Sequence, residues 1–228
     1  MSTLETWTLW SHIVAGAVAL VAGGVAIGTE KGGDRHRRAG RVYVGSMGVV
    51  VGTVPVLLAL DPTDFGRQFL TLVAVFSGYL VFSGYRVLSR KRPADTGETV
   101  DRIAGVLVVV ASLAMGGWGI VLVADGTQLG AVLTVFAVIG VFVGGSDLLA
   151  FRSPDRRDPW MAEHLLRMIG GYIATVTAVS VVNLAGVVPT VVAWLWPTAV
   201  GVPLIWYWQA TYAGVGPLAE AVESAAHE

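Results

Sequence analysis

The sequence predicts an all-α membrane protein, a single domain over residues 1–228 with a bundle of seven transmembrane helices. Three observations predict it. Hydrophobic residues make up 54% of the 228-residue chain and charged residues only 14%, whereas ordinary soluble domains have about 25% charged residues. Long uncharged stretches recur along the chain, and a membrane-spanning helix needs about 20 mostly apolar residues. Basic residues gather in every second connection between those stretches.

The uncharged stretches define the predicted helices in order. Five of them each suffice for one crossing, namely 6–29, 42–60, 68–85, 103–124 and 126–146. The stretch 168–219 has 52 residues without a charge, and the turn-like sequence 183–186 with Pro189 divides it into two crossings. We therefore expect helices at about 7–27, 42–60, 69–88, 103–123, 129–150, 164–184 and 188–208.

The basic residues predict an orientation. Fourteen of the 15 Lys and Arg residues lie in or beside the first, third and fifth connections, and only Arg67 lies in the second. Short cytoplasmic connections collect Lys and Arg, whereas external ones do not. The pattern predicts a multi-pass protein of the cell membrane, with its N-terminus outside and its C-terminus in the cytoplasm.

Several classes of function are excluded by composition. The chain has no cysteine, which excludes disulfides, thiolate metal sites, iron–sulfur clusters and a cysteine nucleophile. Lysine occurs only at 31 and 91, outside the apolar stretches, so a retinal Schiff base is excluded. A net charge of -1 gives no basis for a nucleic-acid partner. Phosphate-binding loops and hydrolase motifs are lacking, and we expect a protein that is not an enzyme.

Small residues at helical spacing predict the packing faces, because they let transmembrane helices approach closely. The first helix has Ala15, Gly16, Ala19, Gly23 and Ala26 beside His12. We expect further packing faces at Gly48 and Gly52 on the second helix, at Gly140, Gly144 and Asp147 on the fifth, and at His164, Gly171 and Thr175 on the sixth.

A polar cluster is predicted at the cytoplasmic ends of the second, fifth and sixth helices. Asp34 can cap the second helix, which places His36 in its first turn with Tyr43 on the same face. Asp158 and Pro159 signal the start of the sixth helix, so that Glu163 and His164 reach a similar depth. The same level holds Asp147 and basic residues that include Arg37 and Arg167.

This cluster has three interpretations. His36 and His164 with the Glu163 carboxylate can hold a divalent metal, or the two imidazoles can ligate haem b while arginines bind its propionates. In the third interpretation the histidines and arginines contact lipid phosphates or complete salt bridges. His12 is separate, and we expect either a neutral imidazole bonded to a Ser or Thr on a neighbouring helix or a residue that lines a path.

Three segments carry a resemblance: 12–16 (HIVAG), 36–43 (HRRAGRVY) and 164–174 (HLLRMIGGYIA), followed by 194–198 (WLWPT) and 201–203 (GVP). With these motifs the chain resembles a family of bacterial and archaeal predicted multi-pass membrane proteins, which is defined by sequence and has no assigned activity. The resemblance covers the first, second, sixth and seventh helices. It implies the membrane fold and points to His12, His36, Arg37, His164 and Arg167.

The leading hypothesis is a membrane protein that binds an ion, a lipid headgroup or a cofactor, either haem b or a divalent metal, at its cytoplasmic end. In it His36 and His164 are the contacts, and Arg37 and Arg167 bind anionic groups. One alternative is a transporter or channel with His12, Pro197 and Pro203 along its path. Another is an accessory subunit. The expected partners are membrane lipids, copies of the same chain or other membrane subunits.

Overall fold

The computed structural model describes residues 2–92, 95–153, 159–184 and 186–218. The described residues form seven α-helices, all of them long and apolar enough to cross a membrane. The prediction of an all-α fold with seven helices long and apolar enough to cross a membrane is therefore confirmed. The helices are α1 (Thr3–Gly28), α2 (Asp34–Leu60), α3 (Phe65–Arg86), which continues into the 3-10 helix η1 (Val87–Ser89), α4 (Thr99–Ala124), α5 (Leu129–Ala150), α6 (Trp160–Asn183) and α7 (Thr190–Ala213).

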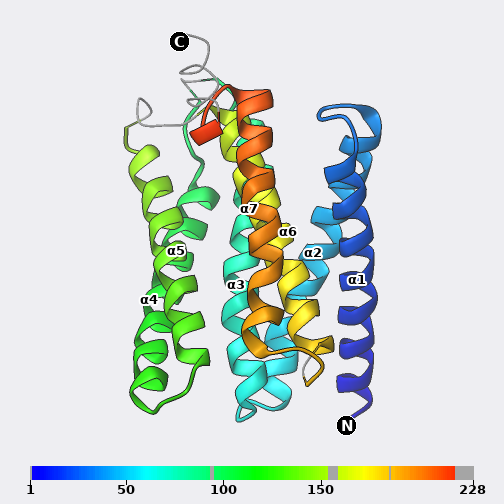
Figure 1. The fold of residues 1–228 in the computed structure, drawn as a ribbon, viewed down its shortest axis with the longest axis vertical. Coiled ribbons are helices and arrows are strands. Elements are labelled where there is room, and N and C mark those ends of the chain that lie inside the picture. Colours follow the sequence, from blue (N-terminus) through cyan, green and yellow to red (C-terminus); the bar gives the residue numbers. More distant parts are fainter. Residues whose placement is uncertain (1, 93–94, 154–158, 185, 219–228) are drawn as a thin grey trace.

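The helices run side by side, up and down, in one bundle (Figure 1). The α4–α5 hairpin forms one edge and α1 with α2 the other, while α3 and α6 pack together between them. We call the end where α1, α3 and α5 finish the basic end. The opposite end, where α1 begins, is the N-terminal end. The seventh helix finishes at the basic end, opposite the start of α1.

Five of the seven helices, α1, α2, α3, α4 and α6, begin at least four residues earlier than predicted. Charged and polar residues still belong to a membrane helix when their side chains reach its polar border. The second helix begins at Asp34 instead of 42, and the sixth at Trp160 instead of 164. The predicted Asp34 cap is wrong, since Gly33 is the N-cap and no side chain bonds there. The start signal at Asp158 lies outside the described residues.

The packing faces match the small-residue pattern on three helices. Gly140 and Gly144 are buried with Asp147 on α5, and Gly171 and Thr175 are buried on α6. On α1, Ala19, Gly23 and Ala26 are buried as predicted, together with Ala22. Gly16 does not belong to this packing face, because a Cβ atom there would meet nothing within 4 Å. The prediction for Gly48 and Gly52 is wrong, because a Cβ atom at either would meet nothing within 4 Å.

Replacing Gly144 with leucine tests the α4–α5 contact. A Cβ atom at Gly144 would lie 2.6 Å from Val108 Cγ1, so the larger side chain must push the helices apart. We expect the free energy of unfolding to fall by about 1–3 kcal/mol, as measured by denaturant unfolding in detergent. The adjacent Gly145, where a Cβ would meet nothing within 4 Å, provides the control: Gly145→Leu should leave stability unchanged. Equal effects of the two variants would contradict this packing.

One apolar core cluster lies away from α1 and α2. Phe69 of α3, Met115 of α4, Leu133 of α5 and Trp194 of α7 are buried in one cluster towards the N-terminal end. The Phe69 and Trp194 rings are edge to face with centroids 5.4 Å apart, a favourable aromatic geometry. The space for ligands lies on the other side of α3, among α1, α2 and α6.

Candidate functional site

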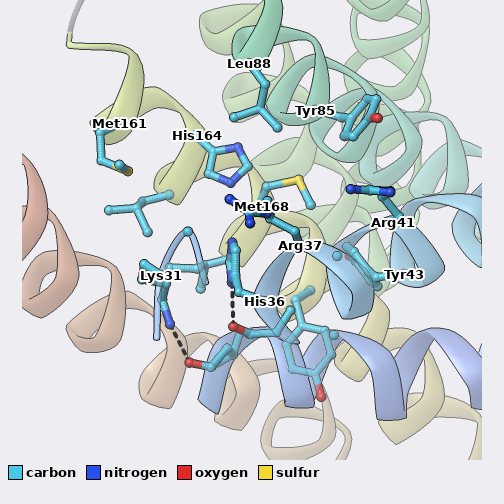
Figure 2. A pocket seen from close by; sticks show the side chains of 18 of the residues that line it. Lys31, His36, Arg37, Arg41, Tyr43, Tyr85, Leu88, Met161, His164 and Met168 are labelled. Atoms are coloured by element: carbon cyan, nitrogen blue, oxygen red, sulfur yellow. Dashed lines mark hydrogen bonds between the residues drawn. The ribbon is translucent and has the colours of Figure 1, made fainter. Parts of the chain in front are cut away.

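The two histidines that the sequence placed at one depth meet in the structure. His36 lies in the first turn of α2 and His164 in the second turn of α6. Their ring centroids are 6.4 Å apart, and the ring planes lie at 74° to each other. Figure 2 shows the two imidazoles one above the other, with a nitrogen of each ring directed towards the other ring.

Both imidazoles have their Nδ1 atom bonded to a backbone carbonyl. His36 Nδ1 lies 2.9 Å from the Ala26 oxygen on α1, and His164 Nδ1 lies 2.8 Å from the Gly84 oxygen on α3. A carbonyl oxygen only accepts hydrogen bonds, so each Nδ1 must carry the hydrogen. In the neutral ring, Nε2 then holds a free lone pair. This is the usual arrangement of metal-binding histidines, in which the second nitrogen is fixed by an outer acceptor.

The two rings border a cavity of about 480 Å³. Its walls come from α1, α2, the end of α3 with η1, and α6. Most of the lining is apolar or small, and it consists of Gly23, Ala26, Ile27, Gly32, Gly40, Leu88, Trp160, Met161, Leu165, Met168 and Ile169, with the aromatic rings of Tyr43, Tyr85 and Tyr172. A cavity of this size suits a small-molecule ligand.

The same cavity has a strongly basic border. Lys31, Arg37, Arg41 and Lys91 all belong to its lining, and none of the described lining residues is an Asp or Glu. Burial lowers the pKa of Lys31, whose Nζ donates to the Ile27 oxygen at 2.5 Å. Clefts lined by one sign of charge concentrate the opposite charge. The cavity therefore favours a ligand with an apolar body and anionic groups.

Arg167 and Asp147 lie beside this cavity, and neither belongs to its lining. They form a buried, bidentate ion pair, with Arg167 Nη2 to Asp147 Oδ1 at 2.5 Å and Nη1 to Oδ2 at 2.6 Å. The Tyr79 hydroxyl donates to the same carboxylate, and Arg167 also donates to the Ser83 hydroxyl at 3.1 Å. The pair joins α3, α5 and α6. These bonds brace the three helices against one another, and the predicted contact of Arg167 and Asp147 with a ligand stays a prediction.

The remaining predicted site residues are placed as follows. Arg37 belongs to the lining, and its guanidinium pairs with Asp34 at the surface. Tyr43 is 2% exposed and lines the inner wall of the cavity. Glu163 lies in the first turn of α6 and is not among the lining residues. Within the described part of the chain, no three His, Cys, Asp or Glu residues are grouped to hold a metal ion.

His12 lies in a second cavity, towards the N-terminal end. Its Nδ1 is 2.8 Å from the Thr53 hydroxyl, so it bonds a threonine on a neighbouring helix, one of the two predicted alternatives. The Thr53 hydroxyl donates its own hydrogen to the Val50 oxygen at 2.7 Å. His12 Nδ1 is therefore the donor to Thr53, and its Nε2 carries a lone pair.

The predicted path along helix 7 is not found in these cavities. Pro197 is buried in α7, and neither Pro197 nor Pro203 lines either of the two cavities. The fifth helix, which the sequence included in the site, also contributes no lining residue to them. The site instead includes α1 and the end of α3.

Sequence reasoning missed the carbonyl acceptors and the lysines of this site. The Ala26 and Gly84 carbonyls accept from the two histidines, and every residue type offers such a carbonyl. Lys31 and Lys91 did stand out as the only lysines of the chain. The sequence shows that both lysines lie outside the apolar stretches, but it does not show that they line the same cavity.

Comparisons with family models, with curated proteins and with solved structures each gave no match to this chain. The resemblance carried by segments 36–43 and 164–174 therefore stays a prediction. What the site binds has to be argued from its own geometry.

Proposed function

We propose that this chain is a cell-membrane protein that binds haem b at its basic end, with His36 and His164 as the axial ligands. The basic end faces the cytoplasm in this proposal, in line with the distribution of Lys and Arg. One observation carries it: two imidazoles, each with Nδ1 bonded to a carbonyl and Nε2 left as the lone-pair atom, lie edge to face with ring centroids 6.4 Å apart in the lining of an apolar cavity with a basic border.

The distance between the rings supports one iron between them. Metal–imidazole bonds of about 2.0–2.1 Å on opposite sides of one metal ion place the two ring centres about 6 Å apart. The observed 6.4 Å agrees with that spacing. A divalent ion held by side chains needs further protein ligands, whereas a porphyrin brings its own four nitrogens.

The lining supports a porphyrin. Its apolar residues suit the faces of a macrocycle, and Lys31, Arg37, Arg41 and Lys91 offer partners for two propionates. Gly40 lies one turn after His36 and lines the same cavity, and a Cβ atom there would meet nothing within 4 Å. The glycine thus leaves space next to the proposed axial ligand.

The proposed site would serve electron transfer. An iron with two protein ligands and four porphyrin nitrogens has no open position for a substrate, so its chemistry is a change of oxidation state. The carbonyls of Ala26 and Gly84 would increase the basicity of the two imidazoles and fix their orientation. The helices α2 and α6 would hold the two rings at a constant separation.

The absorption spectrum of the purified protein tests this function. We expect a Soret band, about one haem per chain by pyridine haemochrome assay, and a six-coordinate, low-spin spectrum. The alternative is that the basic border binds phosphate groups, either of phospholipids or of free phosphate. Phosphorus analysis of the protein in detergent and in lipid-free buffer distinguishes these two sources. Failure to bind added haemin, with stoichiometric phosphorus in the same sample, would overturn the haem proposal in favour of an anion site.

A further inference from the structure

A second cavity of about 540 Å³ lies between the same four helices, towards the N-terminal end. Its walls are mostly aliphatic, and they include Ile13 of α1 and Val182 of α6, which remain 48% and 63% exposed. Because exposed side chains of α1 and α6 border it, the cavity opens sideways, towards the lipid. A ligand would reach it from within the membrane.

A thin partition separates the two cavities. On α2, Tyr43 lines the first cavity and Met47, one turn later, lines the second; on α6, Tyr172 lines the first and Thr175 the second. One helical turn rises about 5.4 Å. The Thr175 hydroxyl lies 3.5 Å from the Tyr43 hydroxyl and 3.4 Å from the Met47 sulfur. These contacts join α2 and α6 across the partition.

An ion pair borders the N-terminal end of the second cavity. Arg67 of α3 binds Glu5 of α1 at 2.6 Å, and its other amino group donates to the Leu57 oxygen of α2 at 2.8 Å. The two charges offset each other, so this cavity attracts neither anions nor cations. Among the described lining residues, His12 offers the imidazole lone pair, on Nε2, that a neutral hydroxyl would recognise.

We propose that the second cavity binds the head of a lipid-soluble quinol, whose hydroxyl donates to His12 Nε2, and that the quinol reduces the haem in the first cavity. The electron-transfer part rests on the proposed function, whereas the binding part does not. An apolar slot that opens to lipid suits the quinol ring and tail. The His12 Nε2 lone pair suits the hydroxyl, and a plain acyl chain would leave that lone pair unbonded.

The redox step balances for one electron. The quinol O–H bond breaks, the proton goes to His12 Nε2, and one electron crosses the partition to the haem iron, which passes from the ferric to the ferrous state. The product is a neutral semiquinone. Transfer of one hydrogen atom between two semiquinones gives one quinone and one quinol. One quinol thus reduces two haems in total, and no further oxidant takes part.

The first arm of the experiment measures binding. A decyl-benzoquinone is titrated into the purified protein in lipid nanodiscs, and bound quinone is measured by equilibrium dialysis. His12→Ala is expected to weaken binding by about tenfold, as for the loss of one hydrogen bond. Gly16→Leu, which fills the cavity at a position where a Cβ would meet nothing within 4 Å, should abolish binding. Gly28→Leu is the matched control on α1, outside the cavity and equally free of close neighbours, and should leave binding unchanged.

The second arm follows the haem spectrum while the decyl-benzoquinol is added without oxygen. We expect the wild type and Gly28→Leu to be reduced alike, and His12→Ala to be reduced at least about tenfold more slowly with an unchanged Soret band, which shows that it folds. If His12→Ala and Gly16→Leu were both reduced as fast as the wild type, the quinol site would be overturned. If fatty acid displaced the bound quinone and His12→Ala bound quinone as well as the wild type, the cavity would be an acyl-chain pocket. This result would also overturn the quinol site. A protein that binds quinone through His12 but takes up no haem would contradict the proposed function and leave the binding part supported.

Discussion

His36→Ala and His164→Ala are each expected to yield protein without a stable six-coordinate haem. Each substitution removes one of two Nε2 ligands, and the remaining ring cannot bind the iron from both sides. The expected result is loss of the low-spin spectrum and of most haem from the purified protein, measured by absorption and pyridine haemochrome assay. The double variant should bind none.

A second pair of variants separates ligand loss from misfolding. Gly40→Leu introduces a side chain into the first cavity at a position with no neighbour within 4 Å, and Gly45→Leu introduces the same side chain on α2 outside that cavity. We expect both proteins to unfold at the same denaturant concentration in their haem-free forms, and only Gly40→Leu to lose haem. Full haem occupancy in Gly40→Leu, or in both histidine variants, would contradict the proposed site.

Asp147→Ala is expected to cost about 3–5 kcal/mol of unfolding free energy, because it leaves the buried Arg167 charge without its counterion. Both side chains of the pair are less than one-tenth exposed, at 7% and 8%, and the Tyr79 hydroxyl loses its acceptor as well. Unfolding in mixed detergent micelles, followed by circular dichroism, measures the loss. Asp34→Ala removes the exposed partner of Arg37 and should change stability by less than about 1 kcal/mol.

The double variant Asp147→Leu with Arg167→Met decides whether Arg167 has a second role. Replacement of a buried ion pair by apolar side chains is often neutral or stabilising, so the double variant should recover most of the stability. Because neither residue lines the first cavity, haem occupancy should stay at the wild-type value. A stable double variant that binds no haem would show that Arg167 contacts the anionic ligand after all.

The sequence alone determined the class of protein and the number of helices. The length of a segment, its hydropathy and the positions of its charges can be read from that segment alone. Together they decide whether the segment can cross a bilayer. They also place His36 and His164 at one end, since each follows the start of its helix by a few residues. The helix starts at Asp34 and Trp160 lie before the uncharged stretches, because interfacial charges do not end a helix.

Only the tertiary structure decided which polar residues share a site. Arg167 and Asp147 lie at the depth that the sequence predicts, yet they point towards each other across α3, α5 and α6. His36 depends on a carbonyl of α1, and His164 depends on a carbonyl of α3. Lipid gives helices no hydrophobic reason to choose one neighbour over another, so the choice depends on close packing of small residues and on a few hydrogen bonds. Such contacts join residues far apart in the chain, and a pattern read along one helix at a time does not contain them.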